Sequence, residues 1–380
     1  MNITLAAIVD SYDAQAALAE ASTIPAPWYV DTRIAALEQE GVFANNWQVA
    51  GRIEQLGEPG RYVTTEAGGE PIVVVRGGDG VLRAFFNVCR HHAAAVVTAA
   101  EGKAEQLRCP YHGWTYSLEG ALKGAPQFAG VCNFELAQHG LLPLAVATWE
   151  KWVFVRVAGG GPPLDGALDP ALIAQFAPLA VGRLHWLERR RYTLDCNWKV
   201  YVDNYLDGGY HVPHLHKALD GVLEPGRYSI ENGERSCLQS SPLRESAGDD
   251  PTGAVRKGSR ALYYWLYPNF MINWYDGIMD TNLVVPHGAD RTEVIFDYYF
   301  SDMSESARAG HQASIAVSER IQDEDAAICS SVQRGLNSRA YNAGRLSVRR
   351  EAGEHLFHRL LHADLQTALQ RQRLRAGVAG

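Results

Sequence analysis

The sequence predicts an α+β protein with two domains, in which an all-β module precedes a mixed domain. Its 380 residues exceed the usual size of a single hydrophobic core. Between residues 45 and 157, short alternating apolar runs are separated by glycines, a pattern typical of β-strands. From residue 158 to residue 380, strand-like and helix-like patterns are mixed, and the Gly/Pro-rich stretch AGGGPPLDG (158–166) is the expected linker.

Hydrophobic periodicity and the positions of Gly and Pro place the individual elements. Residues 1–44 have an amphipathic helical pattern broken by Pro25 and Pro27, so we expect a helical lead-in that packs on the second domain. The GGDG at 77–80 lies between two apolar runs and predicts a hairpin. In the second domain we expect strands at 264–274, 281–286 and 292–300, and helices at about 196–207 and 305–340.

Composition and charge narrow the class of partner. A hydrophobic content of 47% describes a well-packed globular protein, and a formal net charge of -8 argues against nucleic acid or an anionic membrane surface. No apolar run approaches a membrane span, and the N-terminus lacks a basic signal region, so we expect a cytoplasmic protein. Four of the six cysteines show no disulfide-like pattern and are expected to be reduced: Cys132, Cys196, Cys237 and Cys329.

A pair of short motifs in the β module carries the clearest chemical signal. Cys89-x-His91 is followed after seventeen residues by Cys109-x-x-His112. Two thiolates and two imidazoles can bind zinc or an iron–sulfur cluster. Because Cys and His alternate, the set suits a two-iron cluster with thiolates on one iron and imidazoles on the other, which is the Rieske arrangement. His92 is expected to be a neighbour of this site and not a ligand.

The stretch NWKVYVDNYLDGGYHVPHLHK (197–217) holds a second group of polar residues. Asp203 and Asp207 lie on one face of a helix that Gly208 and the next glycine should end. His211 and His216 follow on an irregular segment. Two histidines and one carboxylate form the facial triad of non-haem Fe(II) sites, but this segment offers more than one acid, and exposed histidines would explain the pattern equally well.

A third signal lies in the predicted helix 305–340. At about 100° per residue, Asp325 falls in the middle of an otherwise aliphatic stripe. That stripe comprises Val317, Ile321, Ile328, Val332 and Leu336. A carboxylate among aliphatic side chains needs a cation or several hydrogen-bond donors, so Asp325 is either a metal ligand, a partner for Arg, or a buried structural acid.

Together these motifs resemble the Rieske non-haem iron oxygenase α subunits, and in particular their choline monooxygenase branch. The resemblance runs from about Trp28 to Tyr341 and is carried by NVCRHHA (87–93), CPYHGW (109–114), DNYLDGGYHVP (203–213), YPNFMIN (267–273) and MDTNLV (279–284). It implies a Rieske [2Fe-2S] domain at 45–157 and a helix-grip (START-like) catalytic domain with an antiparallel sheet. It also implies Fe2+ on His211, His216 and Asp325, and a head-to-tail homotrimer.

The resemblance also implies an acidic residue that bridges the first iron histidine and a cluster histidine of the neighbouring subunit. Most of the family places two residues between that acid and the histidine, whereas Asp207 has three residues before His211. We expect Asp207 to serve, because the two glycines at 208 and 209 can absorb the extra residue. Asp203 and Asn204 are the alternatives.

The implied reaction uses O2 and electrons from a separate ferredoxin or flavin/iron–sulfur reductase, through which NAD(P)H acts. The sequence has no GxGxxG between a strand and a helix that would bind a dinucleotide directly.

The dense aromatic stretch at 263–275 suits a quaternary ammonium substrate, although packing in a core would explain these residues as well. Candidates for the substrate pocket are Tyr264, Trp265, Tyr267, Phe270, Trp274 and Tyr275. The segment 274–278 departs from the choline-oxidising pattern, which leaves choline and betaines open. The alternatives are oxidation of an aromatic acid and electron transfer by the cluster alone.

Overall fold

The structure is a computed structural model that describes residues 3–244 and 251–378. The chain folds into two compact units, Gln39–Ala167 and a second unit made of Met1–Glu38 and Leu168–Gly380. Each unit contains a seven-stranded antiparallel sheet, which confirms the expected α+β class. Domain boundaries at 44/45 and 157/158 stay predictions. Within the described residues, no helix is both long and apolar enough to cross a membrane.

The first unit, Gln39–Ala167, consists of antiparallel strands joined by tight turns. Its larger sheet has the order β1-β10-β9-β4-β3-β2-β5, and a smaller sheet has the order β6-β7-β8. The hairpin predicted at 77–80 is confirmed, since β3 and β4 pair from Arg76↔Leu82 and Gly80 adopts a φ of 79° in the turn. The strands are β1 Gln48–Arg52, β2 Arg61–Ala67, β3 Glu70–Arg76, β4 Leu82–Phe86, β5 Glu101–Lys103, β6 Leu107–Arg108, β7 Thr115–Tyr116, β8 Leu122–Gly124, β9 Pro143–Trp149 and β10 Trp152–Arg156.

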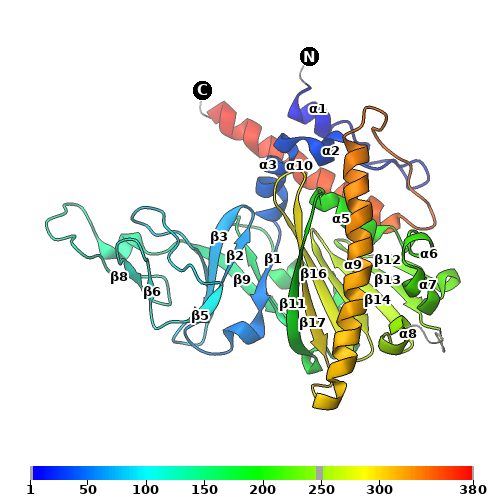
Figure 1. Ribbon diagram of the computed structural model, residues 1–380. Helices are drawn as coiled ribbons and strands as arrows, with labels where there is room; N and C mark the ends of the chain where they lie inside the picture. Colours follow the sequence, from blue (N-terminus) through cyan, green and yellow to red (C-terminus); the bar gives the residue numbers. More distant parts are fainter. Residues whose placement is uncertain (1–2, 245–250, 379–380) are drawn as a thin grey trace. The chain divides into compact units, whose positions relative to one another are not determined.

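The second unit is organised around one antiparallel sheet of order β11-β17-β16-β15-β14-β13-β12 (Figure 1). Aromatic and β-branched residues dominate its strands and are mostly buried, as a sheet with covered faces requires. The strands are β11 His185–Leu194, β12 Ser229–Asn232, β13 Ser236–Pro242, β14 Arg260–Leu266, β15 Phe270–Tyr275, β16 Ile278–Pro286 and β17 Thr292–Phe300.

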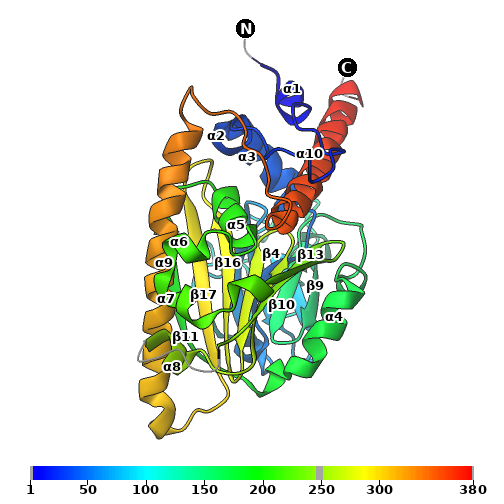
Figure 2. The ribbon, with the colours of Figure 1, turned by 90° about the vertical axis from the view of Figure 1, so that its right-hand side faces the viewer.

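Helices cover this sheet, and the longest, α9 (Arg308–Leu336), runs along one of its faces (Figure 2). The helix α5 (Trp198–Leu206) contacts both α9 and β16, so these two helices and the sheet enclose a space. The remaining helices are α1 Leu5–Val9, α2 Pro27–Val30, α3 Thr32–Glu38, α4 Pro170–Phe176, α6 Val212–Leu215, α7 Lys217–Val222, α8 Pro251–Val255 and α10 Ala352–Val378.

Several elements differ from the expectations. The single strand predicted at 264–274 is wrong, because the chain turns at Tyr267–Asn269 and the segment forms parts of β14 and β15. Pro268 has no N–H to donate to a sheet and therefore interrupts the strand. The helices predicted near 196–207 and 305–340 are confirmed as α5 and α9. The lead-in holds three short helices, and α10 was not predicted.

A buried ion pair joins the lead-in to α5. Lys199 Nζ donates to Glu38 Oε1 at 2.6 Å, and Trp198 Nε1 donates to Glu38 Oε2 at 2.8 Å. All three side chains are almost fully buried. Burial lowers the pKa of Lys199, while Glu38 opposes this effect. The pair therefore fixes the end of α3 against the helix that leads to the candidate site.

We predict that Lys199→Met destabilises the second unit strongly, because it leaves the Glu38 carboxylate buried without its cation. The free energy of unfolding, measured by urea titration, should fall by about 3–5 kcal/mol. The double substitution Glu38→Leu/Lys199→Met should recover most of the loss. Arg308→Met is the control, because its pair with Glu305 is largely exposed and should contribute less than about 1 kcal/mol. Equal losses in Lys199→Met and Arg308→Met would contradict this role of the buried pair.

Candidate functional site

The end of α5 determines where the two site histidines lie. Asn197 caps the start of the helix by accepting a hydrogen bond from Lys199 N at 3.1 Å. The helix ends at Leu206, as expected from the two glycines, both of which have a φ of 67°. A Cβ at Gly208 would lie 2.1 Å from a backbone oxygen, so this turn requires glycine. His211 and His216 then flank the short helix α6.

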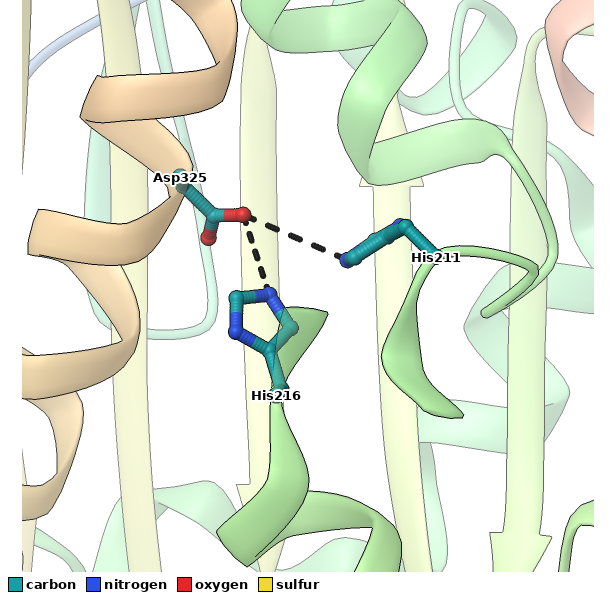
Figure 3. Close-up of side chains that lie close together, drawn as sticks. All are labelled: His211, His216 and Asp325. Carbon is teal, nitrogen blue, oxygen red and sulfur yellow. Dashed lines mark hydrogen bonds and ion pairs between the residues drawn. The ribbon is translucent and has the colours of Figure 1, made fainter. Parts of the chain in front are cut away.

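The structure brings His211, His216 and Asp325 together between α5–α6 and α9 (Figure 3). Asp325 Oδ1 lies 3.0 Å from His216 Nε2 and 4.0 Å from His211 Nε2. One ligand atom from each residue lies within 4.8 Å of the others. His216 is buried, Asp325 and His211 are partly buried, and His214 is exposed. Two nitrogens and one carboxylate oxygen that converge in this way can bind a divalent metal and leave positions open.

A carboxylate contacts the Nδ1 atom of each of the two imidazoles and thereby orients the ring. Asp207 Oδ2 lies 2.6 Å from His211 Nδ1 and also accepts a hydrogen bond from His211 N at 3.0 Å. Glu324 Oε2 lies 2.6 Å from His216 Nδ1. Each carboxylate favours the tautomer with the proton on Nδ1, so both Nε2 atoms face Asp325 as ligand atoms. The extra residue between Asp207 and His211 is thus absorbed by the turn.

Glu324 and Asn204 each contact one of the three candidate metal ligands, a role that the sequence analysis did not assign to them. Asn204 Nδ2 donates to Asp325 Oδ1 at 2.8 Å and orients that carboxylate. Burial lowers the pKa of His216, but the hydrogen bonds to Asp325 and Glu324 outweigh this effect and raise the pKa overall. The surroundings of His216 therefore favour a positive charge, whether it is a proton or a metal ion. Adjacency to Asp325 was the one sequence signal for Glu324.

The other candidates for the bridging acid have different partners. Asp203 Oδ2 accepts from Tyr29 OH at 2.5 Å, and Asp203 Oδ1 lies 3.0 Å from His358 Nε2. Asn204 binds Asp325, as described above. Asp207 is therefore the candidate that contacts His211, and it also lines a recess of about 430 Å³ beside the site.

In the first unit, two loops bring Cys89, His91, Cys109 and His112 together. Matching backbone hydrogen bonds close the loops, from Cys89 N to Ala94 O at 2.8 Å and from Cys109 N to Trp114 O at 2.8 Å. The rings of His91 and His112 have centroids 4.7 Å apart. Both cysteine side chains are buried, and neither forms a disulfide.

The surroundings of these four residues fit a bound cluster. His91 stacks on Trp114 with ring centroids 4.9 Å apart, and its Nδ1 is buried with no hydrogen-bond partner among the described residues. A buried imidazole nitrogen without a partner is expected of a metal ligand. Burial raises the pKa of the Cys109 thiol, against hydrogen bonds from the backbone of Tyr111 and His112. The neighbouring His92 is exposed.

A cavity of about 110 Å³ adjoins His211, His216 and Asp325. Five tyrosines contribute to its wall beside polar and aliphatic side chains: Tyr201, Tyr205, Tyr228, Tyr263 and Tyr275. Of the six aromatic residues predicted to line a pocket, Tyr275 does so here. The other five, Tyr264, Trp265, Tyr267, Phe270 and Trp274, do not line this cavity.

Strand alternation and the position of α10 explain this difference. Tyr264 points to the sheet face opposite Tyr263 and contacts Phe176 of α4, with ring centroids 5.3 Å apart. Phe270 and Trp274 alternate with Tyr275 and so belong to the opposite face of β15. Contacts with Phe357 of α10 cover the remaining two, Trp265 and Tyr267.

Two buried charged residues complete the cavity wall, and neither was predicted. Asp280 accepts a hydrogen bond from Asn273 Nδ2 at 2.7 Å, and burial raises the pKa of its carboxyl group. Arg256 donates to Ser314 Oγ and Ser318 Oγ, both at 2.7 Å. A single sequence could not reveal them, because Arg256 directly follows α8 and Asp280 lies on β16, and only the fold brings both to one cavity.

Comparisons with known proteins agree with this arrangement. Residues 181–367 match the family "Ring hydroxylating alpha subunit (catalytic domain)", and residues 46–136 match "Rieske [2Fe-2S] domain". The chain is 40% identical to the chloroplastic choline monooxygenase of Arabidopsis thaliana, over 94% of this chain and 86% of that protein. It is 33% identical to the carnitine monooxygenase oxygenase subunit of Escherichia coli (strain K12), over 90% and 93% of the two chains.

A solved structure gives the same result for the fold. The crystal structure of a quaternary ammonium Rieske monooxygenase in complex with L-carnitine matches with a TM-score of 0.78 and 27% identity, over 91% of this chain and 95% of that chain. The matches in sequence and structure confirm the resemblance drawn from the motifs and the expected pair of domains.

We predict that Glu324→Ala weakens metal binding at the His211/His216/Asp325 site, because His216 loses the carboxylate that fixes its ring. The affinity for Fe2+, measured by anaerobic titration of the metal-depleted protein, should fall about 10- to 100-fold. Asp323→Ala is the matched control, since Asp323 is the exposed preceding residue of the same helix. An unchanged affinity in Glu324→Ala would exclude an orienting role for Glu324.

Proposed function

Because the chain belongs to the Rieske non-haem iron oxygenase α subunits, in the branch that includes the choline monooxygenases, we propose that it oxidises a small quaternary ammonium compound. Its cofactors are a Rieske [2Fe-2S] cluster and a mononuclear iron, and its co-substrate is O2. It is the terminal oxygenase of a system in which a ferredoxin or reductase partner delivers electrons from NAD(P)H.

The tyrosine-lined cavity beside the three candidate metal ligands carries this proposal. Aromatic faces attract a quaternary ammonium group, which cannot form hydrogen bonds of its own. Asp280 adds a buried carboxylate on the same wall. Relatives are named for choline, carnitine and glycine betaine, all of which carry such a group. We therefore propose choline or a betaine as substrate, with hydroxylation beside the nitrogen or at the alcohol carbon.

The residues of the two sites fit their cofactors. We propose that Cys89, His91, Cys109 and His112 hold the cluster, and that His211, His216 and Asp325 hold the iron. When bound, these groups supply single-electron transfer and the activation of O2. Behind the iron ligands, Asp207 and Glu324 keep each Nδ1 protonated, while Asn204 fixes Asp325.

We also propose that the chain assembles as a head-to-tail homotrimer in which Asp207 connects the iron site to a neighbouring subunit's cluster. Asp207 has the position for this role, because it contacts His211 and also lines the recess of about 430 Å³. Ile328, Val332 and Tyr341 line the same recess, and all three are exposed in the isolated chain. Exposed apolar side chains around an acid are suited to cover by another subunit.

One further prediction and two alternatives complete the proposal. A cytoplasmic location stays a prediction. Electron transfer by the cluster alone gives no reason for the convergence of His211, His216 and Asp325. Oxidation of an aromatic acid is the second candidate, because the cavity contains the cation Arg256, which would bind a carboxylate.

The substrate proposal predicts that quaternary ammonium compounds trigger O2 uptake by the reduced enzyme. The assay uses a surrogate reductase and screens choline, glycine betaine, carnitine, prolyl betaine and several benzoates. Each good cation–aromatic contact is worth about 0.5–2 kcal/mol, so the uncharged isostere 3,3-dimethylbutanol should bind clearly more weakly than choline. Release of formaldehyde would identify oxidation at an N-methyl group. Conversion of choline to the aldehyde that retains its ammonium group would identify oxidation at the alcohol carbon. Coupled uptake with a benzoate and with none of the amines would overturn the proposal in favour of the aromatic acid.

The proposed role of Asp207 predicts slow electron transfer in Asp207→Asn with both cofactors still bound. The neutral amide cannot form the same charged hydrogen bond between two imidazoles. Single-turnover stopped-flow should show cluster oxidation slowed by at least about 10-fold. The matched control is Asp203→Asn, which changes an acid on the same helix that contacts Tyr29 and His358. A slow reaction in Asp203→Asn with a normal rate in Asp207→Asn would move the bridging role to Asp203.

A further inference from the structure

The cavity beside the iron ligands contains one buried cation and one buried anion that do not pair with each other. Arg256 and Asp280 are both buried and both line the cavity. In the described ranges 3–244 and 251–378, the side-chain hydrogen bonds of both residues go to neutral groups, and neither forms an ion pair within 4.0 Å. Asn273 and Asn282 donate hydrogen bonds to Asp280, but the two buried charges form no direct ion pair in the described part of the chain. Buried charges are normally paired or bound to a ligand, so the cavity can accept a ligand that carries both charges.

Arg256 is held in place but not neutralised. Its two terminal nitrogens each donate to a serine of α9, Ser314 and Ser318, at 2.7 Å. Its Cζ lies 4.7 Å from the centroid of the Tyr275 ring. Its Nε is buried and has no hydrogen-bond partner in the described part of the chain. Two neutral hydroxyl groups orient the guanidinium and leave its charge and further N–H donors for a carboxylate.

The position of Arg256 relative to the metal ligands gives the orientation of a bound molecule. Ser318 and Asp325 lie seven residues apart on α9, which corresponds to about 10 Å along the helix axis and nearly the same side. Ile321 and Gln322 line the cavity between them. A carboxylate at Arg256 would therefore lie at the end of the cavity away from His211, His216 and Asp325.

The two charges are also separated along the sheet. Arg256 lies over Tyr275, whereas Asp280 binds Asn273, and these two positions on β15 are two residues apart. Two residues of a strand span about 7 Å. A compact molecule that carries an anion and a cation fits between the two groups, with its anion in contact with Arg256 and its cation beside Asp280.

We propose, building on the proposed function, that the substrate is a compact betaine and that Arg256 is the receptor for its carboxylate. A betaine provides a partner for both buried charges of the wall. Choline would add a second cation to a cavity in which Arg256 already lacks an anion. An aromatic acid would bind Arg256 but leave Asp280 without a cation. The zwitterionic betaine is thus the ligand whose two charges complement both Arg256 and Asp280.

The test compares glycine betaine with its primary amide, which has nearly the same shape and the same ammonium group but no negative charge. The holoenzyme should bind glycine betaine at least about 10-fold more tightly than the amide by calorimetry, because a charge-assisted bond to guanidinium is replaced by a neutral one. The ratio of kcat/KM for the two compounds should follow the same order, and choline should behave like the amide.

Variants of Arg256 separate carboxylate recognition from a structural role. In Arg256→Gln, kcat/KM should fall about 100-fold for glycine betaine but less than about 3-fold for the amide. Arg256→Lys, which keeps the charge and loses the planar fork, should retain part of the preference. Arg260→Gln is the matched control, because Arg260 also donates to a serine, Ser240, but does not line the cavity.

The outcomes distinguish a failure of the proposed role of Arg256 from a failure of the proposed function. Equal binding of glycine betaine and its amide by the wild-type enzyme would overturn the role of Arg256, even if Arg256→Gln failed to fold. A parallel loss for both compounds in Arg256→Gln would likewise leave Arg256 a structural residue. In both cases turnover of quaternary ammonium compounds would keep the proposed function intact. Absence of O2 uptake with every quaternary ammonium compound would instead refute the proposed function itself.

Discussion

The convergence of the Asp325 carboxylate with the imidazoles of His211 and His216 is the constraint on which the catalytic unit depends. Three polar groups gathered between two helices and a sheet are unfavourable unless each has a defined partner. The surrounding residues provide these partners from outside the cluster: Asp207 and Glu324 bind the Nδ1 atoms, and Asn204 binds Asp325. The cost of assembling the polar groups is thereby offset, and the three ligand atoms are left facing one another.

This constraint explains why the buried face of α9 carries many polar side chains. Its most deeply buried positions include Ser314, Ser318, Gln322, Cys329 and Gln333, whereas Ile328 and Val332 of the predicted aliphatic stripe are exposed. The periodicity placed Asp325 on the inner side of the helix together with Val317 and Leu336, which are buried, but it was wrong for Ile328 and Val332. A helix that borders a polar cavity buries polar residues, and a hydrophobic pattern has no means of showing this. The exposed aliphatic residues lie where the proposed trimer would bring another subunit.

How much of each site could be predicted depends on how local it is. The four proposed cluster ligands belong to two short loops, so spacing and residue type were sufficient to propose them. Asp325 follows His211 by 114 residues in the sequence. The helical pattern alone left open whether Asp325 binds a metal or an arginine, and only the family resemblance assigned it to the iron site with the two histidines. The aromatic stretch 263–275 contained Tyr263 and Tyr275 of the cavity wall, but the face of each strand depends on the turn at Tyr267–Asn269 and on the position of α10. Neither is visible in local periodicity.

Arg256 and Asp280 show what the folded structure adds to family membership. The family accounts for the metal ligands and for an aromatic site, yet it does not require a cation and an anion on the same cavity wall. Pairing the two directly would satisfy both and close the cavity to charged ligands. Here the serines of α9 hold Arg256 on one side, and Asn273 holds Asp280 on the other, so the two charges are kept apart. A cavity that maintains separated opposite charges at the expense of stability selects for a ligand with the same separation, because only such a ligand recovers both interactions at once.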